Sequence, residues 1–262
     1  MALVKKRSTL KVWGDVIFAI FLREIKSQST DKIGLIWAVV SPLILIGGMT
    51  ALRTFASGNG DTHGMPTMFF MVYGMILVQF FLGVLGASSG AIQKNKPLYA
   101  FRQVQPISSV IAISFFELLV KIFVVLTIAV ICFVARIDIH VHDAISIIFN
   151  FSKVWLLAVS LGTIFGLSYC YIPELKKILQ LITRPLFFIS GIFFSLQDIP
   201  REYWHYLDWN PLLHAIELTR YAAYPSYGHE GVSYFFFDMC VLVSMFFALA
   251  CYHVSWKQAI SR

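Results

Sequence analysis

Six long apolar runs dominate this sequence and limit what it can fold into. They cover roughly residues 33–53, 66–92, 107–134, 144–171, 177–197 and 231–256. A helix needs about 20 apolar residues to cross the hydrocarbon core of a bilayer, and each run is about that long or longer. In lipid, only helices and closed barrels satisfy every backbone polar group. The sequence therefore predicts an all-α membrane protein with six transmembrane helices in one integral domain.

The overall composition agrees with a membrane protein. Hydrophobic residues make up 58% of the chain and charged residues 13%, whereas soluble domains average about 25% charged residues. No cleavable signal peptide is expected, because the basic start leads into an amphipathic stretch instead of an apolar run with a cleavage site. The four cysteines lie in apolar runs without a CxxC spacing, which predicts buried thiols and no disulfide: Cys132, Cys170, Cys240 and Cys251.

Lysines and arginines alternate between the two sides of the predicted helices. They gather in the N-terminal segment, in the connections before 107–134 and 177–197, and in the C-terminal tail. The opposite side holds only Arg53, Arg136, Arg201 and Arg220. Cytoplasmic loops carry the excess of basic residues, so both termini are expected to be cytoplasmic. This bias also accounts for the net charge of +7 without a nucleic-acid partner.

Residues 8–30 have the pattern of an amphipathic helix. Apolar side chains repeat at helical spacing on one face, as at Leu10, Trp13, Ile17 and Phe21, while charged residues lie elsewhere. Such a helix lies on the membrane surface with its basic groups toward anionic headgroups. We therefore divide the chain into a cytoplasmic amphipathic segment, 1–32, and a transmembrane domain, 33–262.

The stretch 198–230, between the fifth and sixth runs, is neither a span nor a free loop. It has too many charges to cross a bilayer and too much apolar surface for a solvated loop. Pro200 and Pro211 divide it into two short helices, since proline begins a helix well and disrupts its interior. This predicts a re-entrant or interfacial helical hairpin on the outer face. Its aromatic residues either anchor the protein at the interface or guide a sugar polymer, and the pattern alone favours the anchor.

Three charges fall inside the predicted spans, at Glu117, Lys121 and Lys153. A charge at the bilayer centre costs about 2.5–3.5 kcal/mol on insertion scales, so these side chains are expected to face an interior or a wet path. They either line a path for an anionic substrate or form an internal ion pair, and the pattern slightly favours the ion pair. Two GxxxG motifs, Gly86–Gly90 and Gly162–Gly166, favour helix packing within the chain over a dimer seam.

Catalytic, metal and nucleotide signatures are absent from the sequence. The GxxxxGK[ST] motif does not occur, no Ser/His/Asp spacing suggests a hydrolase, and His140 and His142 lack a third ligand in sequence. The chain is therefore expected to be no enzyme, with no metal and no cofactor of its own. If transport is driven by ATP and magnesium, the ATPase is a separate chain.

Two stretches resemble a known family. Residues 21–43, FLREIKSQSTDKIGLIWAVVSPL, resemble the N-terminal signature of ABC-2 type permeases. Residues 184–233, with IPREYW and WNPL, resemble the inner-membrane permease of Gram-negative capsular-polysaccharide ABC exporters, as does the loop NKPLYAFRQVQPIS. The chain departs from that family at residues 27–30, SQST, where an aromatic residue and further basic residues are usual.

The resemblance implies a permease subunit of an ATP-driven exporter that moves lipid-linked capsular polysaccharide across the inner membrane. It implies two copies of the chain, two ATP-binding cassette subunits, a periplasm-spanning co-polymerase-like protein and an outer-membrane polysaccharide channel. The cargo of this family's best-known members is acidic. The alternatives are an ABC-2 exporter of another lipid, glycan or drug and, from another class, a membrane-bound enzyme of glycan synthesis.

Three groups of residues acquire expected roles from this resemblance. The first is the segment that docks on the ATPase: Asn95, Lys96, Pro97 and Leu98. The second is the cytoplasmic entrance for the anionic lipid-linked end: Arg23, Glu24 and Lys26. The third is the outer gate and glycan path: Tyr203, Trp204, Tyr206, Trp209 and Arg220. For the first two groups, simple anchoring by positive charge remains the alternative.

Overall fold

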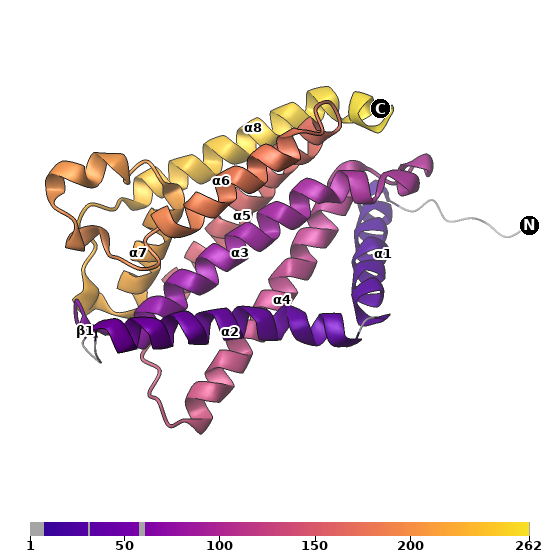
Figure 1. The fold of residues 1–262 in the computed structure, drawn as a ribbon. Helices are drawn as coiled ribbons and strands as arrows, with labels where there is room; N and C mark the ends of the chain where they lie inside the picture. Colours follow the sequence, from indigo (N-terminus) through magenta and orange to yellow (C-terminus); the bar gives the residue numbers. More distant parts are fainter. Residues whose placement is uncertain (1–7, 31, 58–60, 262) are drawn as a thin grey trace, which may run out of the picture.

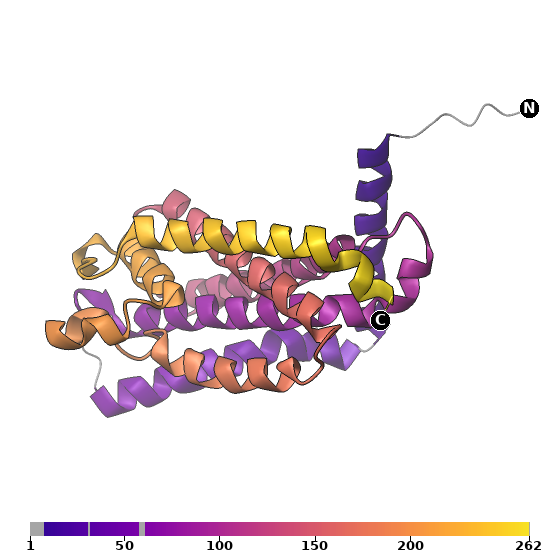
Figure 2. The same cartoon turned by 90° about the horizontal axis from the view of Figure 1, so that it is seen from above.

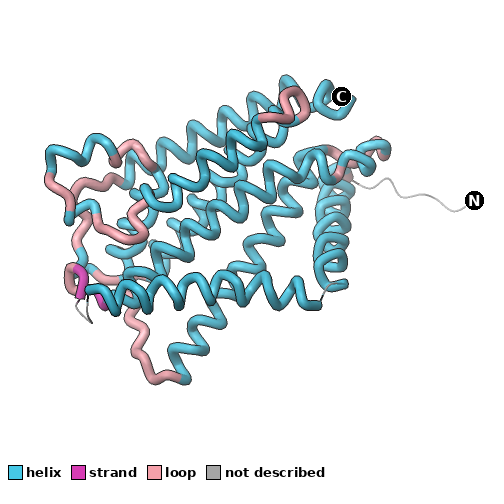
Figure 3. The backbone as a smooth tube through the Cα atoms, in the orientation of Figure 1, coloured by secondary structure: helices cyan, strands magenta, loops and turns pink. Residues whose placement is uncertain are grey.

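The computed structural model describes residues 8–30, 32–57 and 61–261. This part of the chain is mostly helical (Figure 3). The α-helices are α1 (Thr9–Thr30), α2 (Lys32–Ser57), α3 (Thr67–Lys94), α4 (Pro106–Val134), α5 (Ala144–Tyr169), α6 (Leu175–Ile189), α7 (Pro211–Ala223) and α8 (Tyr234–Ser261). The 3-10 helices are η1 (Lys96–Ala100), η2 (Leu196–Asp198), η3 (Arg201–Tyr206) and η4 (Pro225–Tyr227). Two short antiparallel strands, β1 (Asp61–Thr62) and β2 (Met65–Pro66), precede α3.

The long helices form a bundle with two distinct ends. Helices α3, α5, α6 and α8 run in roughly the same direction, whereas α1 stands across that direction at one end (Figures 1 and 2). The last turns of α8 and the connection between α3 and α4 lie at this same end, here called the α1 end. Strand β1 and the segment between α6 and α8 lie at the opposite end, here called the hairpin end (Figure 1).

Four helices in the described residues are long and apolar enough to cross a membrane. They are Thr67–Lys94, Pro106–Val134, Ala144–Tyr169 and Tyr234–Ala259, close to the predicted runs. A shorter apolar helix covers Val39–Phe55 within α2. The helix predicted over 8–30 is present as α1. Six membrane crossings are therefore not confirmed by helix length and composition, which support four.

The fifth predicted span differs most from the structure. We predicted an apolar span over 177–197, but α6 ends at Ile189 after 15 residues. The chain turns at Gly191, whose φ of +75° lies in the left-handed region that favours glycine. No further helix forms until η2 begins at Leu196. The carbonyl groups of residues 191–193 accept hydrogen bonds from distant arginines and take no part in a continued helix.

Helix α3 lies at the centre of the bundle and packs closely against α5. A Cβ added at Gly162 of α5 would lie 2.5 Å from the Cβ of Ser88 in α3. A Cβ at Gly166 would lie 3.0 Å from the carbonyl oxygen of Ser89. These two glycines therefore let the helix backbones approach each other within the chain, as predicted for the second GxxxG motif. Gly86 of the first motif has no atom within 4 Å of such a Cβ.

Candidate functional sites at the two ends of the bundle

Helix α7 is buried in the bundle at the hairpin end, where it packs against α3, α5 and α8. Its start follows from the sequence, because Pro211 occupies the first turn and Asn210 precedes it as a cap. The Asn210 Oδ1 accepts a hydrogen bond from the Leu212 backbone N–H at 3.0 Å. Its Nδ2 donates to Ser190 Oγ at 3.1 Å. The cap therefore joins the start of α7 to the end of α6.

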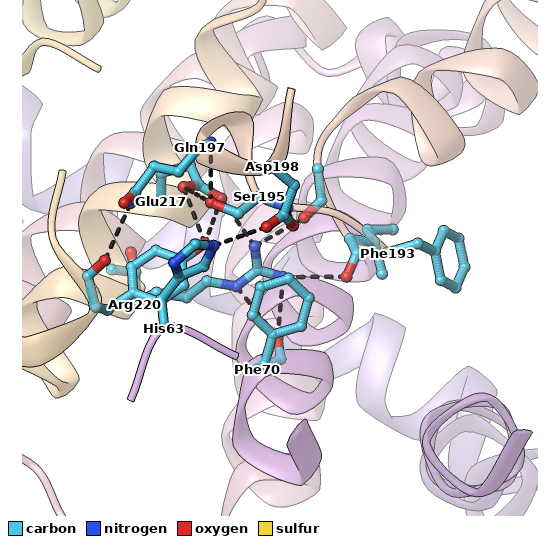
Figure 4. Close-up of polar contacts among 12 residues, drawn as sticks. His63, Phe70, Phe193, Ser195, Gln197, Asp198, Glu217 and Arg220 are labelled. Atoms are coloured by element: carbon cyan, nitrogen blue, oxygen red, sulfur yellow. Dashed lines mark hydrogen bonds and ion pairs between the residues drawn. The ribbon is translucent and has the colours of Figure 1, made fainter. Parts of the chain in front are cut away.

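The Arg220 side chain of α7 is fully buried and uses all five of its N–H donors (Figure 4). Its Nε and Nη2 donate to the Phe70 carbonyl of α3 at 3.2 and 3.0 Å. Its Nη1 donates to the Gly191 carbonyl at 2.8 Å, and its Nη2 donates to the Ile192 carbonyl at 3.1 Å. The fifth bond joins Nη1 to Glu217 Oε1 at 2.9 Å. Arg220 thus connects α3, α7 and the turn after α6.

Glu217 is the anionic partner of Arg220 and is equally buried. Its carboxylate accepts hydrogen bonds from the Tyr227 hydroxyl at 2.9 and 3.0 Å and from Ser195 Oγ at 3.0 Å. Burial raises the pKa of the Tyr227 phenol, which therefore remains a proton donor to this carboxylate. A buried charge is tolerated when it is both paired and hydrogen-bonded, and both conditions hold for this pair.

Space for the Arg220 guanidinium depends on a glycine in α3. A Cβ added at Gly74 would lie 2.7 Å from Arg220 Nη2 and 3.3 Å from the Ile192 Cα. A second arginine reaches the same region from α2, because Arg53 donates to the Phe193 carbonyl and lies 4.4 Å above the Phe70 ring. Two arginines from different helices therefore hold the turn after α6.

A second polar contact fixes the hairpin between β1 and β2. The His63 Nε2 lies 2.7 Å from Asp198 Oδ1, as Figure 4 shows. The other carboxylate oxygen of Asp198 accepts from the Ser195 backbone N–H at 2.9 Å, and Ser226 Oγ donates to the Gly64 carbonyl at 3.2 Å. The segment 190–227 and the β-hairpin are thus held together as one unit.

The four predicted aromatic residues lie in or next to η3, and three of them form an exposed surface. Tyr203, Tyr206 and Trp209 are 54%, 63% and 58% exposed, and we call these three the outer aromatic group. The Trp209 Nε1 donates to the Tyr206 carbonyl at 2.7 Å, so its ring face, rather than its N–H, is available. Trp204 is only half-exposed, since its Nε1 bonds to the Ile199 carbonyl at 2.8 Å and its ring packs on Gly231.

The structure separates Arg220 from the outer aromatic group. We predicted Arg220 as a glycan contact, but its guanidinium is buried and its donors are all used within the protein. Its partner Glu217, together with Ser195 and Tyr227, was not among the predicted site residues. The spacing of Glu217 and Arg220, three residues apart in a short apolar helix, was the available signal for an internal pair.

At the α1 end, the structure brings two predicted groups together. Lys94, the last residue of α3, places its Nζ 2.5 Å from Glu24 Oε1, and this carboxylate is buried. The Arg23 guanidinium donates to Asn95 Oδ1, while Asn95 Nδ2 donates to the Ala91 carbonyl at 2.8 Å. The predicted entrance residues of α1 are therefore bonded to the residues that immediately precede η1.

The predicted docking segment is only partly exposed. Lys96 and Pro97 are exposed and Leu98 is half-buried, but Asn95 is completely buried. Asn95 is thus a helix-terminating residue that bonds to Arg23, and it cannot present its side chain to a partner. Tyr99 is also buried, and burial raises the pKa of its phenol to about 12. Lys26, the third entrance residue, is exposed on α1.

The three charges of the predicted spans do not converge on one site. Lys121 Nζ lies 3.5 Å from Gln79 Oε1, at the limit of a hydrogen bond. Glu117 is half-buried one turn away, with its carboxylate near Gly83 of α3. Lys153 pairs with a different residue, since its Nζ lies 2.6 Å from Asp238 Oδ1 in α8. Glu117 and Lys121 therefore face α3, whereas Lys153 faces α8.

Comparison with known proteins gives a consistent result over nearly the whole chain. The sequence profile described as ABC-2 type transporter matches residues 15–224. "Polysialic acid transport protein KpsM" of Escherichia coli is 35% identical over 256 residues, which cover 94% of this chain and 95% of that protein.

Two further relatives are more distant. "Capsule polysaccharide export inner-membrane protein CtrC" of Neisseria meningitidis serogroup A is 25% identical over 90% of this chain and 89% of that protein. "Capsule polysaccharide export inner-membrane protein BexB" of Haemophilus influenzae is 24% identical over 82% of this chain and 81% of that protein. The chain therefore belongs to the ABC-2 type transporter family.

Proposed function

We propose that this chain is the permease subunit of an ATP-driven exporter that moves capsular polysaccharide across the inner membrane. The observation that carries this proposal is the 35% identity to a polysialic acid transport protein along 94% of the chain. The more distant relatives are also described as capsule polysaccharide export proteins of the inner membrane. The chain is a transport subunit, so ATP and magnesium are used by separate ATPase subunits.

Six crossings with cytoplasmic termini are the topology that best fits this role. Helix α6 is only about 22 Å long at 1.5 Å per residue, shorter than the hydrocarbon core of about 30 Å. Irregular backbone at membrane depth is tolerated only where it is buried in protein or lines a wet cavity. The hydrogen bonds from Arg220 and Arg53 to residues 191–193 supply the partners that such backbone needs. They support a crossing by α6 and a re-entrant path for α7.

A second copy of the chain would cover the exposed polar stripe of α6. Lys177, Gln180 and Arg184 lie at helical spacing on this helix, and all three are exposed. Lys177 lies in the first turn of α6, near the cytoplasmic surface, whereas Arg184 is the tenth of its 15 residues and, if it faced lipid, would cost up to about 2.5–3.5 kcal/mol at the bilayer centre. At an interface between two copies, the same stripe would line a wet path with positive charge. This lining suits an acidic polymer, which is the cargo that we propose, carried on a lipid terminus.

ATPase movement would enter through η1. Lys96 and Pro97 are exposed there, while Lys94 and Asn95 just before them are bonded to α1. When an ATPase subunit displaces the η1 of one chain, α1 and α3 of that chain would therefore move together. Because Arg23 and Glu24 already have partners in the protein, the entrance would depend on the positive charge of the α1 end as a whole.

The outer aromatic group would meet the polymer at the other side of the membrane. Exposed aromatic rings stack on the C–H faces of sugars, and the hydroxyls of Tyr203 and Tyr206 can bond to sugar hydroxyls. The same face would adjoin a periplasm-spanning co-polymerase-like protein and, through it, an outer-membrane channel. Their presence is implied by the proposed export route.

Deletion of the gene in its host tests this function directly. Capsular polymer trapped in the cytoplasm with a bare cell surface is the expected result, measured by surface staining and by extraction of the cytoplasmic fraction. Re-expression of the intact chain provides the control. Polymer missing from both places would refute export and indicate synthesis. A normal surface capsule would indicate an ABC-2 exporter of a different cargo.

A further inference from the structure

An apolar groove runs between α1 and α4 on the outside of the bundle. Its walls include Gly14, Phe18 and Phe21 of α1 and Phe115, Leu119 and Ile122 of α4. The cavity has a volume of about 580 Å³, and every residue in its walls is apolar or glycine. Phe18 and Ile122 are more than half exposed. Exposed apolar surface on a candidate membrane-spanning helix such as α4 faces lipid by default, and a hollow in that surface can hold an apolar chain.

The length of the groove suits a hydrocarbon chain. Its wall on α4 runs from residue 112 to residue 126, which is about 21 Å at 1.5 Å per residue. One leaflet contributes about 15 Å of the hydrocarbon core. Helix α4 is inclined to its neighbours in Figure 1, so the groove extends less far along the bundle than along the helix itself. An acyl chain of one leaflet therefore matches it.

Charge identifies the end at which a headgroup would lie. Helix α1 crosses the direction of the bundle, as an interfacial helix does (Figure 2). Lys11 precedes Gly14 by three residues and Phe18 by seven, so it borders the Phe18 side of the α1 face that lines the groove, next to Leu10. Its side chain is exposed. A positive charge at the mouth of an apolar groove complements a lipid with an anionic headgroup.

A neighbouring groove fits the same kind of ligand. It lies between α4 and α5, has a volume of about 460 Å³, and shares Leu118, Ile122 and Leu126 with the first groove. These three residues, spaced by four, form a ridge along α4 with one groove on each side. The walls of the second groove also include Lys121 and Ser152, but its other residues are apolar, and two adjacent grooves suit a lipid with two chains better than a lipid with one.

We propose that the α1–α4 groove binds an acyl chain of an anionic diacyl phospholipid of the bilayer, with its headgroup at Lys11. A bilayer lipid fits better than a second copy of the chain, because the groove walls carry no charge that needs cover. The charged stripe of α6 is the surface that needs a protein partner. The bound lipid would fix α1 against α4 and hence the position of Arg23 and Glu24. This site does not depend on the identity of the cargo.

Lipid binding to the full-length chain can be measured by native mass spectrometry in mild detergent, with diacyl phosphatidylglycerol and phosphatidylethanolamine as probes. In Gly14→Leu, the new side chain fills the groove, because no atom lies within 4 Å of a Cβ at Gly14. A leucine side chain that excludes about two methylenes of the acyl chain, at about 0.8 kcal/mol each, should weaken the binding of both lipids about tenfold. Gly48→Leu is the matched control, because its Cβ also meets nothing within 4 Å. Both changes favour a helix.

The contact between the Lys11 charge and the lipid headgroup is tested by a separate variant. Lys11→Gln is expected to weaken phosphatidylglycerol about fivefold, the equivalent of about 1 kcal/mol for one basic residue, and to leave phosphatidylethanolamine unchanged. If Gly14→Leu bound the lipids as tightly as the wild type, or if Gly48→Leu lost as much lipid affinity, the groove would not be the lipid site. An equal effect of Lys11→Gln on both lipids, or no effect, would overturn the headgroup site. Disulfide-linked dimers of Phe18→Cys in native membranes would show a protein interface in its place.

Discussion

Replacement of Arg220 by alanine is expected to destabilise the protein and not merely to weaken contact with the cargo. The change leaves the buried Glu217 carboxylate without its cation and removes the donors to three backbone carbonyls. Loss of one partner from a buried ion pair costs about 3–5 kcal/mol. This is a large part of the roughly 5–15 kcal/mol that holds a typical domain folded. The melting temperature should then fall by roughly 6–20 °C, at about 2–4 °C per kcal/mol.

Thermal unfolding of the detergent-purified chain, together with its abundance in membranes, measures this effect. The matched control is Arg201→Ala in the same hairpin, whose 2.8 Å ion pair with Glu230 is largely exposed. Surface pairs of this kind contribute about 0–1 kcal/mol, so the control should melt close to the wild type. The double variant Arg220→Met with Glu217→Gln leaves no uncompensated charge, and we expect it to be more stable than Arg220→Ala.

One result would refute this reasoning. If Arg220→Ala had wild-type abundance and a wild-type melting temperature but exported no polymer, the guanidinium would act on the cargo directly. The structure with Arg220 buried would then be a closed state, and the hairpin would have to open to expose the guanidinium.

Three further predictions concern the other sites. Charge reversal of Glu24 or Lys94 alone should reduce capsule export, because their 2.5 Å ion pair joins α1 to α3. The combined swap should restore part of the export, as measured by surface staining at matched protein levels. A swap that restores no export would contradict this prediction. Alanine at all three positions of the outer aromatic group should lower export, since these rings are exposed. The abundance of the protein in membranes and ATP hydrolysis by the complex should not change. An equal loss of protein abundance would indicate that the rings contribute to folding. Gly162→Val should destabilise the chain by about 1–3 kcal/mol through overpacking, while Gly86→Ala, with open space around it, should melt at or slightly above the wild type.

Hydrophobic patterning was sufficient to predict most of the helices. The run 107–134 corresponds to Pro106–Val134, and the amphipathic pattern over 8–30 corresponds to Thr9–Thr30. Prolines also marked local starts correctly, because Pro211 begins α7 and Pro200 directly precedes η3. These features depend on neighbours in sequence, so a single sequence contains them.

The end of α6 and the role of Arg220 could not be predicted in the same way. Residues 190–197 are largely apolar like the helix before them, and the one local signal for a stop after Ile189 is Gly191, which permits a left-handed turn but does not by itself require one. The backbone leaves the helix there because its carbonyls find donors on Arg220 and Arg53, far away in the sequence. Arg220 in turn bonds to Phe70, a partner 150 residues away. Such pairings become visible only once the helices are packed.

The two candidate sites are joined by α3, and this connection gives the proposed coupling a physical route. At the α1 end, α3 finishes at Lys94, which is paired with α1 and followed directly by η1. At the hairpin end, the Phe70 carbonyl of α3 accepts two hydrogen bonds from Arg220. The helix between them is about 42 Å long, mostly buried and packed against α5 through glycine contacts. A shift of η1 that moves α3 along its axis therefore shifts the acceptor of Arg220, and with it the hairpin that carries the outer aromatic group.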